Sequence, residues 1–258
     1  GIYLDNVDNG KIINNNCSNN YDYGIYLLSN SNNNTLSGNT VNNNPHGIFL
    51  DGSNNNNLSG NTANNNPFGI FLMGSNNNNL SGNTACNNPH GIFLDGSNNN
   101  NLSGNTANNN PFGIFLMGSN NNNLSGNTAC NNDYGIYLVS SNNNNLSGNT
   151  ACNNNEYGIS LSSSNNNNLS ENIMDFCGIS LSGSLAELAS HIIDDTNLVN
   201  NKPVYYYVNE PGLDSSNFTY AGQIFLINCN DSLILDLEFS KCSSGILKRF
   251  RIFKREKS

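Results

Sequence analysis

The sequence predicts an all-β fold, a right-handed parallel β-helix with coils of about 22 residues and an irregular insertion near the C-terminus. Residues 45–88 recur letter for letter as residues 89–132, and each copy divides into two near-identical halves. A Gly-Ile pair recurs every 20 to 23 residues, a period typical of solenoids. The remainder of each repeat is rich in Asn, Ser, Gly and Pro, which favour turns over helix. Parallel crossovers are usually right-handed.

Each coil should hold a small apolar core. Alternation along the strand turns Ile48 and Leu50 inward and Phe49 outward, and the second strand adds Leu58. Asn61 falls at a corner of the coil, where its amide can bond the identical amide of the next coil. We therefore expect an Asn ladder along Asn61, Asn83, Asn105, Asn127 and Asn149.

The chain divides into four segments. Residues 1–182 read as β-helix repeats, and residues 183–221 as an insertion. In it, residues 185–189 form a helical turn or a bulky loop, and residues 203–208 a strand. Residues 222–247 restore the pattern as further coils. Residues 248–258 form a basic tail that either frays or contacts an anionic polymer or lipid.

Charge and hydropathy limit the partners and the location. No Lys or Arg lies between Lys11 and Lys202, so the acidic body should repel nucleic acids and anionic polysaccharides. No apolar run of membrane-spanning length is present. The chain opens on a coil with Gly rather than Met, so we expect an excerpt of a longer protein with neighbouring domains. Recurrent Asn-Leu-Ser sequons are compatible with secretion.

Three of the seven cysteines share one repeat position. Cys130 and Cys152 should lie on adjacent coils, at a separation that permits a disulfide, whereas Cys86 is two coils from Cys130. We favour the simpler interpretation that small residues are tolerated at this turn, because no zinc-type Cys-x-x-Cys spacing exists.

One outward column of aromatic residues is the candidate ligand site. A row of exposed rings at one-coil spacing is unusual on a monomer surface and could stack on the sugars of a neutral glycan. Alternatively the insertion, a neighbouring domain or a second molecule covers the row, or it only stabilises a ladder. We favour a structural or adhesive role slightly over glycan binding. The candidate residues are Tyr26, Phe49, Phe71, Phe93, Phe115 and Tyr137, flanked by Asp51 and Asp95.

The sequence predicts neither catalysis nor a cofactor or metal. The coils lack the basic residues that polysaccharide lyases need. Asp51 and Asp95 lie two coils apart, roughly 9.6 Å at strand spacing, which keeps glycoside hydrolysis as an alternative. The soft or borderline ligands of this face should lie too far apart for any two of them to share a copper ion; they are His46, His90, Met73 and Met117. We instead expect a stack of rings along Tyr23, His46, Phe68, His90, Phe112, Tyr134 and Tyr157.

The repeats resemble a known family. Coils that combine Gly-Ile-aromatic-Leu, Ser-Asn-Asn and Gly-Asn-Thr are similar to the parallel β-helix repeats of the NosD family of periplasmic copper-binding proteins and of archaeal surface proteins. Residues 201–207, 221–224 and 228–232 look like the C-terminal part of such repeats. The resemblance implies the β-helix and, as an alternative function, a periplasmic role in copper binding or maturation. We expect a non-catalytic module located outside the cell, on its surface or in the periplasm.

Overall fold

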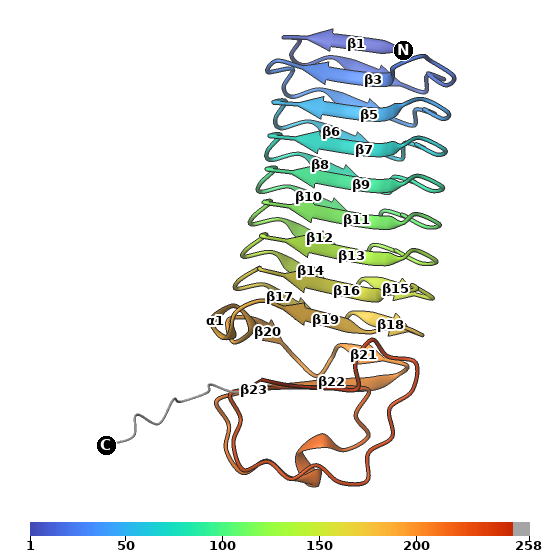
Figure 1. Cartoon of the computed structure of the whole chain (residues 1–258). Helices are drawn as coiled ribbons and strands as arrows, with labels where there is room; N and C mark the ends of the chain where they lie inside the picture. The colour runs from blue at the N-terminus through green and yellow to red at the C-terminus, as the bar shows by residue number, and fades with distance from the viewer. Residues whose placement is uncertain (250–258) are drawn as a thin grey trace.

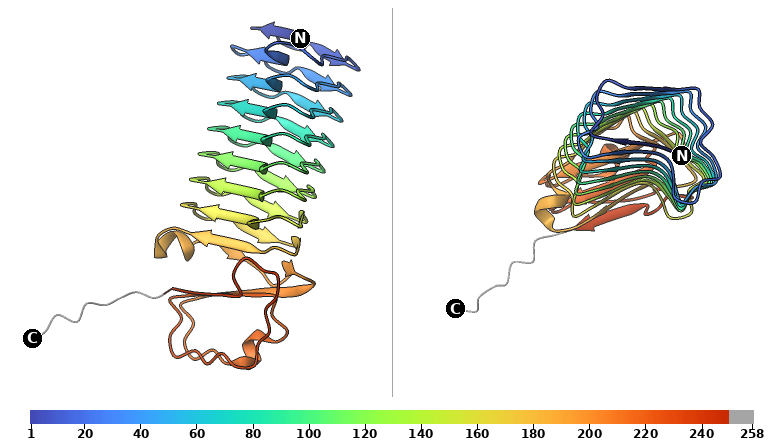
Figure 2. Two further views of the ribbon diagram at one scale, coloured as in Figure 1. Left: turned by 45° about the vertical axis from the view of Figure 1, so that its right-hand side comes forward. Right: turned by 90° about the horizontal axis from the view of Figure 1, so that it is seen from above.

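The computed structural model describes residues 1–249 of the 258-residue chain. Its successive coils stack into a column with the N-terminus at one end (Figure 1). Seen from above, the coils superimpose on a common outline, as the right-hand panel of Figure 2 shows. The predicted all-β parallel solenoid is therefore confirmed.

Sheet A forms one side of the column and contains nine parallel strands. Each strand pairs with the equivalent strand of the coils before and after it, so identical repeat positions align in columns along the sheet. Its strands are β1 (Ile2–Asp5), β3 (Tyr23–Leu28), β5 (His46–Asp51), β7 (Phe68–Met73), β9 (His90–Asp95), β11 (Phe112–Met117), β13 (Tyr134–Val139), β16 (Tyr157–Ser162) and β19 (Ile179–Ser182).

Sheet B forms the second side, also with nine parallel strands. These strands are shorter, and their central residue points into the core. They are β2 (Lys11–Ile13), β4 (Thr35–Ser37), β6 (Asn57–Ser59), β8 (Asn79–Ser81), β10 (Asn101–Ser103), β12 (Asn123–Ser125), β14 (Asn145–Ser147), β17 (Asn168–Ser170) and β20 (Ile192–Ile193).

The third side begins with a single bridge between Asn16 and Thr40 and continues as single bridges between threonines of successive coils up to Thr150. It then widens into sheet C, whose strands are β15 (Thr150–Cys152), β18 (Ile173–Asp175), β21 (Leu198–Val199), β22 (Lys202–Val208), β23 (Gln223–Ile227) and β24 (Ile246–Arg249).

The corners between the three sides explain the Asn-rich and Gly-rich composition. In the coil that begins at β5, four residues have a left-handed backbone: Gly52, Asn55, Gly60 and Asn65, with φ between 57° and 60°. Glycine and asparagine adopt this conformation at a lower cost than other residues. The repeat therefore keeps these two residue types where the chain turns.

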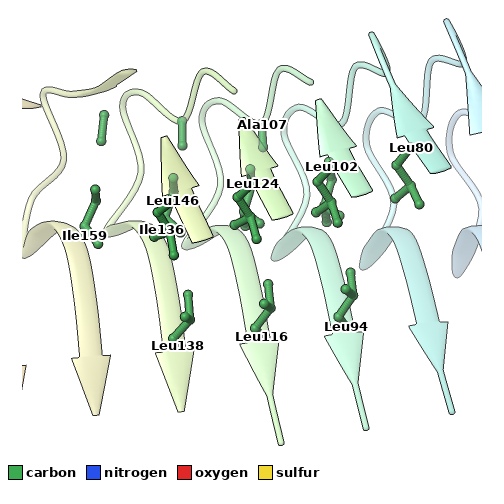
Figure 3. Packing of buried hydrophobic residues seen from close by; sticks show 14 of the residues in the cluster. Leu80, Leu94, Leu102, Ala107, Leu116, Leu124, Ile136, Leu138, Leu146 and Ile159 are labelled. Atoms are coloured by element: carbon green, nitrogen blue, oxygen red, sulfur yellow. The ribbon is translucent and has the colours of Figure 1, made fainter. Parts of the chain in front are cut away.

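The core is a continuous apolar row inside the column. Ile48, Leu50, Leu58 and Ala63 are all fully buried, and the same four positions recur from coil to coil. Figure 3 shows these side chains stacked between the sheets, for example Leu102, Leu124 and Leu146 of sheet B. Each buried Leu or Ile stabilises the fold by about 1.5–3 kcal/mol relative to exposure. The predicted inward positions are confirmed.

Buried asparagines form ladders beside this core. The Asn83 side chain oxygen accepts hydrogen bonds from the Asn61 backbone N–H and the Asn61 amide, both at 3.0 Å. The Asn61 amide also donates to the Leu36 carbonyl at 2.9 Å. The pattern repeats at Asn105 and Asn127. The predicted ladder is confirmed, and it satisfies backbone groups that the corners leave unpaired.

The C-terminal part closes the column. Strands β20 and β21 extend sheets B and C by pairing with β17 and β18, whereas β22 runs antiparallel to β21. Helix α1 (Leu185–Leu188) and the strand β22 confirm the predicted helical turn and strand. The 3₁₀ helix η1 (Ser215–Phe218) and the fully buried strand β23 enclose a second small core that contains Leu213, Phe218 and Ile224.

Neither of the two helices among residues 1–249 is long enough to span a bilayer. The predicted segment boundaries at residues 182, 221 and 247 stay predictions. The basic tail, residues 248–258, lies outside the described residues except for its first two, which belong to β24.

Candidate functional site

The outer face of sheet A carries three aligned columns of side chains, which we call columns 1, 2 and 3. Within each repeat they are the first, fourth and sixth residues of the strand, as in His46, Phe49 and Asp51 of β5. A Cβ on Gly47 would lie only 2.4 Å from the Gly69 carbonyl oxygen and 3.2 Å from the Ala63 Cβ. Only a residue without a side chain fits at position 47, close to the inside of the coil. The flanking residues of the strand carry their rings on the outer face.

Column 2 holds the six rings that the sequence singled out, and they stack on one another. Phe49 and Phe71 have ring centroids 4.7 Å apart at an interplanar angle of 8°, and Phe71 and Phe93 repeat this geometry at 4.9 Å and 6°. The stack continues through Phe115 to Tyr137. Because both faces of a central ring contact neighbouring rings, mainly the ring edges face solvent.

The expectation of exposed rings is therefore wrong for half of the column. Tyr26, Phe49 and Phe93 are only 6–9% exposed. Each ring of column 2 stacks on its neighbours, and rings of column 1 lie beside it, as between His46 and Phe49 at 5.7 Å. The sequence analysis treated the two columns separately, although their spacing along the strand places them side by side. Whether the face binds a ligand stays a prediction.

Column 1 is the ring stack that the sequence predicts. His46 lies between Tyr23 and Phe68 at centroid distances of 4.9 and 5.3 Å, and His90 lies between Phe68 and Phe112 at 4.9 and 5.2 Å. Burial lowers the pKa of both imidazoles. Their buried Nδ1 atoms have no hydrogen-bond partner within the described chain. Both imidazoles are therefore neutral members of an aromatic stack near pH 7.

Column 3 alternates between carboxylate and thioether. Asp51, Met73, Asp95 and Met117 align in register on successive coils. The Tyr26 hydroxyl donates to Asp51 Oδ2 at 3.4 Å. Burial, together with the Asp51 charge, raises the pKa of Tyr26 to about 12. This face thus combines ring edges with carboxylates that repeat every second coil.

The outer face does not fit a copper ion. Its two histidines are separated by the ring of Phe68. Within residues 1–249, no three His, Cys, Asp or Glu side chains gather in a way that could hold a metal ion.

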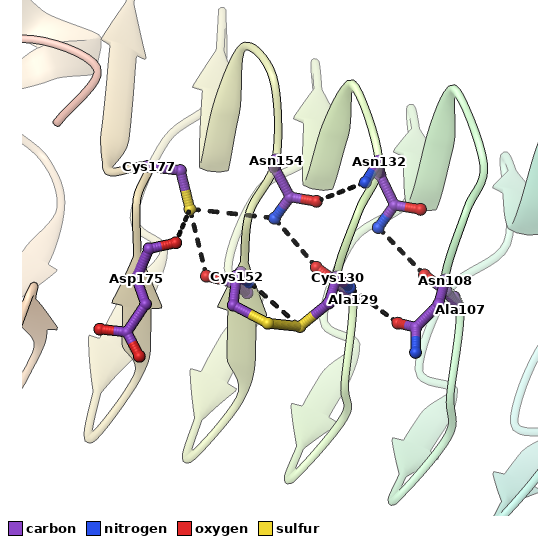
Figure 4. The surroundings of a disulfide bond; sticks show 10 residues. Ala107, Asn108, Ala129, Cys130, Asn132, Cys152, Asn154, Asp175 and Cys177 are labelled. Atoms are coloured by element: carbon purple, nitrogen blue, oxygen red, sulfur yellow. Dashed lines mark hydrogen bonds between the residues drawn. A yellow bond between two sulfur atoms is a disulfide. The ribbon is translucent and has the colours of Figure 1, made fainter. Parts of the chain in front are cut away.

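One pair of cysteines is bonded. Cys130 and Cys152 form a disulfide between adjacent coils, with Cα atoms 4.5 Å apart (Figure 4). The interpretation as small residues tolerated at a turn is therefore wrong for this pair. The repeat places the two side chains at the same position of adjacent coils, within bonding distance.

A cavity of about 580 Å³ lies where the C-terminal segment folds back onto the column. Sequence reasoning missed it, because its walls come from segments more than 60 residues apart. The Lys241 ammonium lies 4.4 Å from the centroid of the Phe176 ring. The side of the column contributes Glu156, Tyr157, Phe176 and Cys177, and the C-terminal segment contributes Lys241, Cys242 and Ser243.

Comparisons with known proteins give a family and a set of enzymes with the same fold. A family model described as periplasmic copper-binding protein (NosD) matches residues 1–105 and 74–210. A mutant of the periplasmic alginate epimerase AlgG shares 26% identity at a TM-score of 0.56, covering 74% of this chain and 48% of AlgG. This chain thus spans about half the length of AlgG. No curated protein sequence matches.

The A-module of the mannuronan C-5 epimerase AlgE4 from Azotobacter vinelandii matches 97% of this chain and 78% of its own length, at a TM-score of 0.56 and 13% identity. At that identity the likeness shows the fold alone. The likeness to AlgG is closer, and AlgG is an enzyme. The expectation that this chain is not an enzyme is contradicted by that likeness.

Proposed function

We propose that this chain, which belongs to the NosD family of periplasmic copper-binding proteins, binds a polysaccharide along the outer face of sheet A. The observation that carries the proposal is the repetition of the same surface groups on successive coils. A polymer lying parallel to the column axis would meet these groups at regular intervals. The likeness to an alginate epimerase supports a polymeric sugar as the ligand.

The repeat along the face suits a chain molecule. Asp51 and Asp95 are two strand spacings apart, roughly 9.6 Å, with Met73 between them. Carboxylates accept strong hydrogen bonds from hydroxyl groups. The exposed edges of Phe71, Phe115 and the methionines offer apolar contact beside them. Successive carboxylates would then bind hydroxyls of the same polymer two coils apart.

The charge of the face favours a neutral polysaccharide. No Lys or Arg lies between Lys11 and Lys202, whereas column 3 presents Asp51 and Asp95. A polymer of acidic sugars would be repelled by these carboxylates. We therefore expect a ligand that differs in charge from mannuronan. We also place the protein in the periplasm or outside the cell. An archaeal source stays a prediction.

A binding assay tests this proposal. Neutral and acidic polysaccharides immobilised on an array are probed with the protein, with an Asp51→Asn/Asp95→Asn variant and with an Asp231→Asn/Asp236→Asn control. The control removes the same charge from exposed loop positions of the C-terminal segment. We expect a neutral polysaccharide to bind, at least about tenfold more weakly in the column 3 variant, since hydrogen bonds to charged groups contribute about 1.5–3 kcal/mol. Equal weakening in both variants would contradict the proposal.

Glycoside hydrolysis is a second candidate, carried by the same two carboxylates. Inverting glycosidases hold their carboxylic acid and carboxylate about 6.5–9.5 Å apart, close to the spacing of Asp51 and Asp95. One group would protonate the leaving oxygen as the glycosidic bond breaks, and the other would take a proton from the attacking water. Assays for new reducing ends on every bound polysaccharide test this. Release that survives both single Asp→Asn variants would exclude the pair.

A further inference from the structure

Two adjacent cavities lie where the C-terminal segment folds back onto the column, and they share one pair of residues. Their volumes are about 580 and about 370 Å³. Both fall in the range of about 300–1,000 Å³ that is typical of small-ligand sites. Phe176 and Lys241 line both cavities, and the Lys241 ammonium lies 4.4 Å from the centroid of the Phe176 ring. A ligand in either cavity would therefore meet this ring.

The identity of residue 176 departs from the repeat. In earlier coils the equivalent corner residue is an asparagine with a left-handed backbone, at φ between 52° and 59°. These asparagines are Asn65, Asn87, Asn109, Asn131 and Asn153. Phe176 keeps this backbone, with φ 59°, although a bulky residue adopts it at a higher cost than asparagine. Because its side chain is 52% exposed, neither the turn nor the core requires phenylalanine here.

A single side chain, that of Asn200, fixes the shared ring and the shared ammonium relative to each other. Its oxygen accepts a hydrogen bond from the Phe176 backbone N–H at 2.8 Å. Its amide donates to the carbonyl groups of Ser240 and Lys241, at 2.7 and 3.3 Å. The column and the C-terminal segment are thus linked at the cavities. Because the two walls are preorganised, a ligand loses less affinity to the entropic cost of ordering them.

The charged groups of the walls suit a ligand that carries hydroxyl groups. Glu156 lines the first cavity and Asp175 the second, so each cavity has a carboxylate besides the shared Lys241 ammonium. Carboxylates accept hydrogen bonds and an ammonium donates them, whereas a hydroxyl group does both. Among the described residues that line the cavities, two carboxylates outnumber one ammonium, so an anionic ligand is disfavoured.

A neutral sugar matches this combination of an exposed ring and charged hydrogen-bond partners. The C–H groups on one face of a sugar pack against an aromatic ring, while the hydroxyls at its rim form hydrogen bonds. We infer that the two cavities bind a short neutral oligosaccharide, one sugar of which stacks on the Phe176 ring. Glu156, Asp175 and Lys241 supply hydrogen bonds to its hydroxyls. Because Phe176 follows β18 of sheet C, this site is separate from the outer face of sheet A and does not rest on the function proposed for that face.

Titration with soluble trisaccharides tests the inference. The protein carries Asp51→Asn and Asp95→Asn, so that the carboxylates of column 3 take no part. Cellotriose, mannotriose and triacetylchitotriose serve as neutral probes, and a trimer of mannuronate and inorganic phosphate as anionic ones. Calorimetry measures affinity, and proton NMR reports stacking, because the ring current of Phe176 shifts the C–H protons of a stacked sugar. We expect at least one neutral trisaccharide to bind with shifted C–H protons, and neither anion to bind comparably.

Matched variants locate the bound sugar. Phe176→Asn restores the residue of the repeat and should weaken binding by about tenfold or more, since an aromatic contact contributes on this order. Lys241→Gln keeps a donor but removes the charge, and should weaken binding by about threefold or more. Tyr220→Asn is the control. Tyr220 also has a left-handed backbone and has the Lys202 ammonium 4.9 Å from its ring centroid, but it lines neither cavity. Its replacement should leave the affinity unchanged.

Three results would overturn the inference. They are no binding of any neutral trisaccharide, an affinity unchanged in Phe176→Asn, or an equal loss in Tyr220→Asn. Thermal unfolding of each variant reports whether the contact between Phe176 and Lys241 only holds the C-terminal segment on the column. If Phe176→Asn lowers the unfolding midpoint and no bound sugar shows shifted C–H protons, the contact is structural and the inference fails. Polysaccharide binding along sheet A is unaffected by these outcomes, because the background already lacks the carboxylates of column 3.

Discussion

Replacing Asn105 by alanine should destabilise the column far more than the same change at Asn101 in the same coil. Asn105 is fully buried, and its oxygen accepts hydrogen bonds from the Asn83 backbone N–H and the Asn83 amide, both at 3.0 Å. Its amide donates to the Leu80 carbonyl at 2.9 Å and to Asn127 at 3.0 Å. Alanine removes all four bonds at once.

The magnitude follows from the groups left behind. The Asn83 N–H and the Leu80 carbonyl lose their side-chain partners inside the column, and each buried unsatisfied group costs about 1–3 kcal/mol. We expect a loss of about 2–6 kcal/mol. Asn101 instead points outward and is half-buried, and its two bonds, to Asn79 and from Asn123, can be replaced by water. Its removal should cost less than about 1 kcal/mol.

Urea unfolding followed by circular dichroism measures the difference. Midpoints are compared rather than extrapolated free energies, because solenoids unfold less cooperatively than compact domains. The Asn105→Ala midpoint should fall well below that of Asn101→Ala. Coincident midpoints would refute the claim that the buried amide ladder, rather than asparagine content as such, stabilises the coils.

Three further outcomes are expected from thermal or urea unfolding. Burial lowers the pKa of His191 from 6.5 to about 4, so the unfolded state binds the proton more tightly than the folded state. The free energy of unfolding should therefore be highest above about pH 6.5 and fall by about 3 kcal/mol as the pH drops towards 4. The His191→Gln variant should lack this loss. The double variant Cys130→Ser/Cys152→Ser should lower the free energy of unfolding by about 3 kcal/mol, because it opens the loop that the disulfide closes across a separation of 22 residues. A reductant should produce the same loss in the parent protein. Gly91→Ala places a Cβ 2.5 Å from a backbone oxygen of the next coil and should clearly lower the unfolding midpoint. Gly104 is open to solvent but has φ near 60°, so Gly104→Ala should lower the free energy of unfolding by about 1 kcal/mol.

The repeat made most of the fold predictable. In a column where each coil contacts only its neighbours, the period of the sequence determines which residues align between coils. The inward positions of Ile48, Leu50 and Leu58 could therefore be predicted from a single coil. The ladder through Asn61 follows in the same way. The helical turn at α1 was also predictable, because Ser184 and Glu187 form a capping box.

The candidate site was predicted in composition but not in exposure. Composition and period do not show that the rings of column 2 stack on one another and lie beside column 1, a packing in which Phe49 and Phe93 are buried. The cavity was beyond reach for a different reason. Its walls near Cys177 and Cys242 are joined by no repeat register, because the intervening chain leaves the coil pattern at β22, which runs antiparallel to β21.

The last coils show why the chemistry gathers at this end of the column. Every coil must supply an acceptor for the corner N–H groups of the preceding one, and asparagine does this along the repeats. At the end of two such rows asparagine gives way to more reactive groups. The His191 imidazole accepts from the Asn167 N–H at 3.3 Å, and Cys177 follows Asn154. The same structural requirement is thus met by side chains that can also titrate. A repeat protein can change its acceptors only where no further identical coil must stack, so departures from the repeat at its final coils are the places to test for function.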